Sequence, residues 1–209
     1  HGSNINASIP TKGLPESSKK IIQILQKRPT FLMVGTVEPR KGHQLALEAF
    51  DRLLANGKDI NLVIVGRAGW KTENLVEQIK IHPELGKRLF WLDGISDEYL
   101  EKVYNSSSAL LALSESEGFG LPLIEAAYHG LPIIARDIAV FREVCKDGAF
   151  YVKVESAGIL QQKIEDWMQL FREGNHPKSI NVKPQSWKES TRQLLNVIEN
   201  IQKIKFEWK

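Results

Sequence analysis

The chain has 209 residues, of which 42% are hydrophobic and 25% charged, an ordinary composition for one globular α/β domain with a substantial core. Its formal net charge of +3 is too small to indicate a nucleic-acid partner or an anionic membrane surface. The single Cys145 cannot form an internal disulfide, and no apolar run approaches the length of a transmembrane helix. We therefore expect a cytoplasmic protein, with peripheral contact at the inner face of the membrane left open.

Residues 1–20 are expected to form a linker or hinge, because they are rich in Ser, Asn, Pro and Gly. A short helix is predicted over residues 19–28, and Pro29 is expected to end it. The folded domain is then expected to extend over residues 21–182.

Apolar runs and amphipathic segments alternate through this domain, which predicts alternating strands and helices. Strands are predicted at 31–35, 61–66, 88–93, 109–114, 131–136 and 149–154. Helices are predicted at 41–55, 72–81, 96–105, 121–129, 141–145, 157–172 and 185–205. Continuous apolar strands between amphipathic helices favour an α/β fold: a Rossmann-like open parallel sheet of about six strands with helices on both faces.

Ligands of open parallel sheets bind beyond the carboxyl ends of the strands, and the distinctive loops of this chain follow predicted strands. Arg40 and Lys41 end a glycine-bearing loop after the first strand. Arginine can grip a diphosphate with a bidentate fork, and lysine can neutralise it as a point charge. The alternative is an exposed basic pair, which is disfavoured because positive charge opposes the dipole at a helix N-terminus.

Two acids, Glu117 and Glu125, lie eight positions apart around a Gly-Phe-Gly turn that opens a helix after the fourth strand. Gly118 and Gly120 permit close approach of the backbone, and the helix beginning near Leu121 directs free N–H groups at a phosphate. Because carboxylates repel phosphate, acids at this position indicate a hydroxyl-rich partner such as ribose or a sugar. The pattern therefore predicts a nucleotide-sugar site.

Three stretches resemble those of retaining glycosyltransferases with the GT-B fold, the group 1 or family 4 enzymes. They are residues 34–42 (VGTVEPRKG), 62–66 (LVIVG) and 114–126 (SESEGFGLPLIEA), the last matching the family's E-x7-E motif. The resemblance covers roughly residues 30–155 and belongs to the C-terminal, donor-binding domain of the family. It implies that a glycan acceptor is held by a second, N-terminal GT-B domain, and that residues 183–209 form a helix crossing back towards it.

The resemblance also implies residue roles. Arg40 and Lys41 would stabilise the leaving nucleoside diphosphate and Glu117 would bind the transferred sugar, which makes these three the expected catalytic residues. Glu125 would bind the ribose hydroxyls. The expected donor-binding residues are Gly35, Gly66, Trp91, Leu92, Gly118, Phe119, Gly120, Leu121 and Glu125. The family packs the nucleobase near the end of the third strand, and for Trp91 core packing is an open alternative.

No metal site and no cofactor are expected. His43 and His129 are isolated and fit structural positions, and no His or acid positions show metal-ligand spacing. The family, by resemblance, neutralises the diphosphate with side chains and a helix dipole.

The second loop departs from the family, which has G-x-G there, because two residues separate Gly66 from Gly69. No role is therefore carried over to Arg67 or Trp70. The loop at 35–41 resembles a subset rich in mannosyltransferases that use GDP-mannose, while UDP-sugars stay open.

The sequence thus predicts the donor-binding domain of a retaining glycosyltransferase that transfers a hexosyl group, inactive in isolation. Alternatives are a non-catalytic nucleotide-sugar-binding module and a GT-B sugar-nucleotide epimerase, which would lack the E-x7-E pattern. A nicotinamide dehydrogenase is disfavoured, because no Gly-x-Gly-x-x-Gly follows the first strand.

Overall fold

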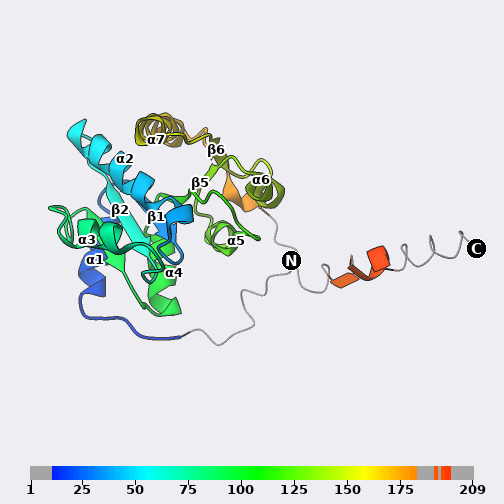
Figure 1. Ribbon diagram of the computed structural model, residues 1–209, viewed down its shortest axis with the longest axis horizontal. Helices are drawn as coiled ribbons and strands as arrows, with labels where there is room; N and C mark the ends of the chain where they lie inside the picture. Colours follow the sequence, from blue (N-terminus) through cyan, green and yellow to red (C-terminus); the bar gives the residue numbers. More distant parts are fainter. Residues whose placement is uncertain (1–10, 183–190, 193, 199–209) are drawn as a thin grey trace, which may run out of the picture.

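The computed structural model describes residues 11–182, 191–192 and 194–198. Within these residues six strands form one parallel sheet in the order β3-β2-β1-β4-β5-β6. Figure 1 labels the strands β1, β2, β5 and β6 and the helices around them. The strands are β1 (Thr30–Val34), β2 (Asn61–Val65), β3 (Leu89–Leu92), β4 (Ala109–Ala112), β5 (Ile133–Arg136) and β6 (Phe150–Val152). The predicted Rossmann-like parallel sheet is confirmed.

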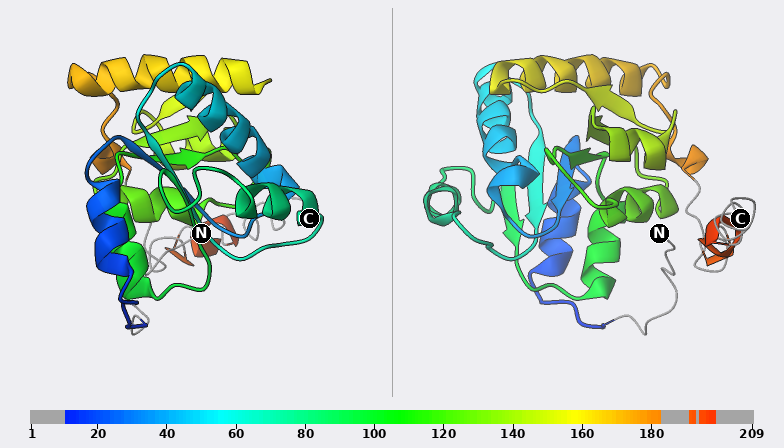
Figure 2. Two further views of the ribbon diagram at one scale, coloured as in Figure 1. Left: turned by 90° about the vertical axis from the view of Figure 1, so that its left-hand side faces the viewer. Right: turned by 45° about the vertical axis from the view of Figure 1, so that its right-hand side comes forward.

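Helices cover both faces of this sheet, and each face has its own hydrophobic core. They are α1 (Ser18–Leu25), α2 (His43–Ala55), α3 (Glu73–Lys80), α4 (Asp97–Asn105), α5 (Leu121–Tyr128), α6 (Ala139–Cys145) and α7 (Ala157–Arg172). Side chains of α2, α3 and α7 make one core, and those of α1, α4, α5 and α6 make the other. Figure 2 shows α2 (cyan) and α7 (yellow) on one side of the sheet and α1 (blue) on the opposite side.

The strands are apolar on both faces because both faces are covered. All five residues of β2 are buried, and the β1 side chains Phe31 and Leu32 point to opposite cores. Trp167 of α7 anchors the first core and packs edge-to-face on Phe31, with ring centroids 5.7 Å apart. This two-sided burial fixes the directions in which the loops leave the sheet.

The strand order reverses between β1 and β4, which lie side by side in the centre of the sheet. The chain leaves β1 towards α2 on one face and leaves β4 towards α5 on the other. The loops after these two strands therefore diverge and leave a crevice at the carboxyl edge, which is the usual ligand position of open α/β sheets.

The start of the second predicted helix differs from expectation. A short 3-10 turn, η1 (Pro39–Lys41), comes first, and α2 begins only at His43. Gly42 joins the two with φ of 77°, and a Cβ on it would lie 2.8 Å from the Cβ of Leu113. Only glycine permits this turn so close to the end of β4, so Arg40 and Lys41 lie in a loop beside β4 and not in the first turn of α2.

The two ends of the chain were predicted as linker and crossover helix. At the N-terminal end α1 already includes Ser18, and the backbone N–H of Thr11 donates to Asp97 of α4 at 2.8 Å. Most of the predicted helix 185–205 lies outside the described residues, although 191–192 and 194–198 are helical. None of the helices in the described part of the chain combines the length and hydrophobicity needed to cross a bilayer.

Candidate functional site

A charged cluster occupies the crevice between the loops after β1 and β4. Lys41 pairs with Oε1 of Glu117, and Nη1 of Arg40 lies 3.6 Å from Oε2 of the same carboxylate. Arg40 also donates to the backbone carbonyl of Ser116 at 3.0 Å, and its Nε lies 3.0 Å from Oε2 of Glu38. The structure therefore brings together the three residues that the sequence predicts to be catalytic.

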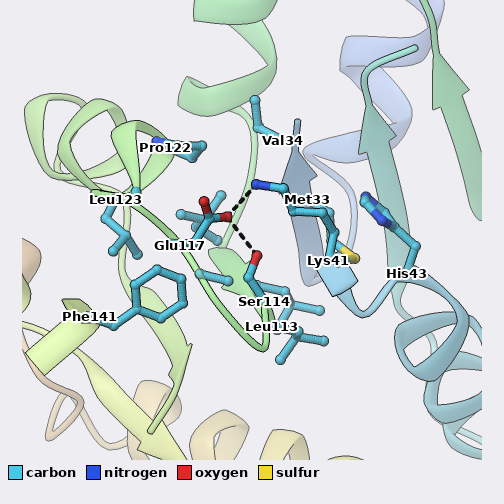
Figure 3. A pocket seen from close by; sticks show the side chains of 14 residues that line it. Met33, Val34, Lys41, His43, Leu113, Ser114, Glu117, Pro122, Leu123 and Phe141 are labelled. Carbon is cyan, nitrogen blue, oxygen red and sulfur yellow. Dashed lines mark hydrogen bonds and ion pairs between the residues drawn. The ribbon is translucent and has the colours of Figure 1, made fainter. Parts of the chain in front are cut away.

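Ser114 completes this cluster and was not singled out from the sequence. Ser114 lies just after β4, and its hydroxyl donates to Oε1 of Glu117 at 2.8 Å (Figure 3). Figure 3 also shows the side chain of Lys41 reaching the same carboxylate, while the ring of His43 is turned away from it. Ser114 belongs to the motif at residues 114–126, but the spacing of the motif does not tell which of its hydroxyls faces Glu117.

The side chains around Glu117 keep it in its ionised, carboxylate form. Burial disfavours the charged form, but hydrogen bonds from Lys41 and Ser114 and the positive charges of Lys41 and Arg40 outweigh it and lower the pKa of Glu117. Its side chain is only 14% exposed. An ionised, oriented carboxylate accepts hydrogen bonds and has no proton to donate, which suits the hydroxyl groups of a sugar.

A small pocket lies against this cluster and runs towards α5. Glu117, Lys41 and Ser114 form its polar side, and the apolar side includes Pro122, Leu123 and Phe141 (Figure 3). It encloses about 20 Å³, which is room for one water molecule. A hexose would therefore have to lie at the mouth of this pocket, on the solvent side of the charged cluster.

The turn into α5 presents the start of a helix to the crevice. Gly120 is the N-cap residue, with φ of 88°, and Leu121, which is 53% exposed, begins the helix. Gly118 is exposed and Phe119 half-buried. Free N–H groups in the first turn of a helix attract anions, so this geometry is compatible with a bound phosphate, and the phosphate contact stays a prediction.

The loops after β1 and β2 touch each other at the same edge. The backbone N–H of Gly35 donates to the carbonyl of Val65 at 2.9 Å, and Nε1 of Trp91 donates to the carbonyl of Gly66 at 2.8 Å. Trp91 is half-buried and packs against the first core, whereas Leu92 is buried in the second. Trp91 thus has a structural contact, and its expected contact with a nucleobase stays a prediction.

Glu125 lies apart from the Glu117 cluster and is not among the residues that line the small pocket. It is half-buried on α5, where the hydroxyl of Tyr104 donates to its Oε2 at 2.7 Å. The two acids of the E-x7-E pattern therefore have separate surroundings, one facing cations and the other facing a tyrosine.

Among the described residues, no three His, Cys, Asp or Glu side chains gather into a group that could hold a metal ion. The two histidines considered from the sequence differ in their surroundings, and His43 lines the small pocket. His43 is buried, and the ring of His129 stacks on Tyr104 with centroids 5.0 Å apart.

The sequence profile described as "Glycosyl transferases group 1" matches residues 16–199. The chain belongs to this family. It is 45% identical, over 93% of its length, to the serotype-specific mannosyltransferase WbdA of Escherichia coli, and it covers 24% of that protein. The chain thus spans about a quarter of the length of this curated relative.

Two solved structures of glycosyltransferases share the fold. The C-terminal domain of the group 1 family protein LpcC from Francisella tularensis has a TM-score of 0.62 at 20% identity, covering 80% of this chain and 89% of that one. Anabaena HepE, solved in complex with UDP-glucose, has a TM-score of 0.68 at 16% identity, covering 90% of this chain and 54% of that one. These similarities confirm that the chain has the fold of a group 1 glycosyltransferase C-terminal domain.

In this group 1 glycosyltransferase chain, Arg40, Lys41 and Glu117 meet in one cluster, and the helix turn at Gly120 borders the same pocket. Gly35, Gly66 and Trp91 form a second group at the ends of β1 to β3. Sequence reasoning missed Ser114, and it missed the tyrosine that binds Glu125. Tyr104 comes from α4, so its distance from Glu125 depends on the tertiary fold. Ser114 lies in the same loop as Glu117, and their contact depends on the conformation of that loop.

Proposed function

We propose that this chain is the donor-binding domain of a retaining glycosyltransferase and binds a nucleotide sugar in the crevice between β1 and β4. One observation carries the proposal: Arg40 and Lys41 from one loop converge on Glu117 from the other, beside the pocket that α5 borders. Cations and a helix N-terminus suit a diphosphate, and an ionised acid suits sugar hydroxyls. Membership of the family supports the same assignment.

The proposed chemistry breaks the bond between the anomeric carbon of the sugar and the diphosphate oxygen and forms one to an acceptor hydroxyl on the same face. The hydroxyl proton passes to an oxygen of the leaving diphosphate, so the anomeric configuration is retained. Arg40, Lys41 and the N-terminus of α5 would stabilise the negative charge that develops on the diphosphate, as preorganised donors do in other enzymes. Glu117 would hold the sugar and offset positive charge on its ring.

We propose GDP-mannose as the donor and a glycan as the acceptor. The WbdA relative is named a mannosyltransferase, and the chain is 45% identical to it. UDP-sugars are the competing donors, since the HepE structure holds UDP-glucose. The acceptor would be held by a second, N-terminal GT-B domain, and no metal ion is expected to be required.

Calorimetric titration with GDP, UDP and ADP, each with and without magnesium, tests the donor site. We expect one nucleotide, GDP, to bind without magnesium and the Lys41→Ala variant to lose this binding. Lys80→Ala is the matched control, because Lys80 is exposed at the far end of α3. Loss of one charged contact corresponds to roughly tenfold or more in affinity.

Binding that is equal in wild type and Lys41→Ala would contradict the proposed site. Binding of GDP and UDP with the same affinity would contradict the proposed donor base and leave the diphosphate site in place. A requirement for magnesium would show that Arg40 and Lys41 do not suffice to neutralise the diphosphate.

A further inference from the structure

A second polar contact, separate from the charged cluster around Glu117, joins α4 to α5. The hydroxyl of Tyr104 donates to Oε2 of Glu125 at 2.7 Å. Tyr104 is only 2% exposed, whereas Glu125 is half-buried and reaches solvent. The hydrogen bond therefore runs from the core of the domain outward to a carboxylate on the α5 surface.

The ring of Tyr104 is fixed from two sides. It belongs to the core formed by α1, α4, α5 and α6, and the ring of His129 stacks on it with an interplanar angle of 12°. Nδ1 of His129 lies 3.1 Å from Oδ1 of Asn105. A tyrosine held in this way can place a hydroxyl within narrow limits, as residues that support a binding group must.

The hydroxyl of Tyr104 remains a donor over the whole physiological range. Burial and the adjacent charge of Glu125 both raise the pKa of Tyr104 above its ordinary value. Glu125 is thus the acceptor, and the hydrogen bonds of the described residues leave its Oε1 without a protein donor.

We propose that Tyr104 is a positioning residue for donor binding: it ties down one oxygen of Glu125 so that the other is oriented towards the ribose hydroxyls of the nucleotide. This proposal rests on the proposed function and on the ribose contact that the family resemblance implies for Glu125, since it assumes that a nucleotide binds beside α5. The pair then acts as one unit. Glu125 contacts the nucleotide, and Tyr104 acts through Glu125 without contacting the nucleotide itself.

Ribose recognition gives a readout that a merely structural tyrosine would not change. The affinity of the purified chain for GDP and for 2′-deoxy- and 3′-deoxy-GDP is measured by calorimetry, with the UDP series in parallel. In wild type we expect GDP to bind about tenfold more tightly than at least one deoxy analogue, because the site loses a charged hydrogen bond. In Tyr104→Phe we expect this ratio to fall towards one.

Tyr99→Phe is the matched control. Tyr99 lies on the same helix, is also 2% exposed, and its hydroxyl has no hydrogen-bond partner among the described residues. We expect it to retain the wild-type ratio. The double variant Tyr104→Phe/Glu125→Gln should discriminate no less than Glu125→Gln alone, since Tyr104 has nothing left to position.

The outcomes separate the two proposals. A wild-type chain that binds neither nucleotide overturns the proposed function and this inference with it. A wild type that binds, with an unchanged ratio of ribose to deoxyribose affinity in Tyr104→Phe, overturns the positioning role alone. Because the ratio is measured on folded protein, a lower stability of Tyr104→Phe changes neither reading, and a thermal melt of each variant confirms that it is folded.

Discussion

At the scale of single residues, the charges of the cluster around Glu117 are balanced before any ligand binds. Arg40 and Lys41 supply two positive charges, and the nearby Glu38 and Glu117 supply two negative ones. A buried pair is costly to break, because the remaining charge is left uncompensated. We infer that a diphosphate competes with Glu117 for Arg40 and Lys41. Once the diphosphate pairs with these two cations, Glu117 is free to turn towards the hydroxyls of the sugar.

His43 lies beside this cluster and offers a pH-dependent test of the fold. Burial lowers the pKa of His43 to about 4, the backbone carbonyl of Glu38 opposes the shift, and the charge of Lys41 adds to it. The pKa in the unfolded chain is the ordinary 6.5. As pH falls below 6.5, His43 becomes protonated in the unfolded chain but stays neutral in the folded protein. The free energy of unfolding therefore decreases between pH 6.5 and about 4.

We expect this single group to reduce the free energy of unfolding by about 3 kcal/mol across that window. Urea unfolding at several pH values between 4 and 7.5 measures it, with His43→Gln as the comparison. His43→Gln should show a shallower decline on the acid side, whatever its stability at pH 7. Parallel curves for the two proteins would show that His43 titrates normally.

At the scale of the element, chain order and type could be predicted and loop geometry could not. Apolar runs located all six strands, since strands covered on both faces must be apolar throughout. The start of α2 was placed too early, at Lys41, because a 3-10 turn and a helix share similar periodicity over three residues. Gly42 was the available signal, since a positive φ interrupts a helix.

The loops after β1 and β2 supply the prediction at this scale. Gly66 has φ of 149°, and a Cβ on it would lie 2.0 Å from the carbonyl oxygen of Gly35. Gly35 has φ of 135°, and a Cβ on it would meet nothing within 4 Å. An alanine at either position would be under backbone strain, but only at Gly66 would its Cβ also clash, which makes the two glycines a matched pair.

We expect Gly35→Ala to cost about 1 kcal/mol from backbone strain alone. Gly66→Ala should cost more than about 3 kcal/mol, because backbone must move apart at the carboxyl edge of the sheet. Urea denaturation of the two variants gives both values. Equal costs would mean that the two loops are not packed as described.

At the scale of the whole molecule, the position of the site followed from topology and its composition from tertiary contacts. Ligand binding at the carboxyl edge is a general property of open parallel sheets, so Arg40, Lys41 and the helix turn could be predicted as neighbours. The pairing of Ser114 with Glu117 could not be predicted, because it depends on the conformation of the loop after β4. The pairing of Tyr104 with Glu125 could not be predicted either, because it depends on how α4 and α5 lie against each other. Sequence patterns thus predict which residues gather at the site, whereas their hydrogen-bond partners are seen only in the structure.

The same topology leaves the charged cluster around Glu117 at an open edge of the sheet, with a pocket of only about 20 Å³ behind it. Such a site can hold a diphosphate but gives an acceptor hydroxyl no fixed position, and orientation supplies much of the acceleration in group transfer. We therefore expect the isolated chain to bind GDP-mannose without transferring mannose. A longer protein that includes the proposed N-terminal domain should transfer it, as the chain's one-quarter share of WbdA suggests.

In that longer protein, Lys41→Ala should raise the barrier by about 3 kcal/mol, a loss of about two orders of magnitude in kcat. Lys80→Ala should leave kcat unchanged. Product analysis with GDP-mannose and a glycan acceptor measures transfer, and inversion of the anomeric configuration would contradict the retaining mechanism. Efficient transfer by the isolated chain would show that an acceptor is held within these residues, and a second domain would then be unnecessary for catalysis.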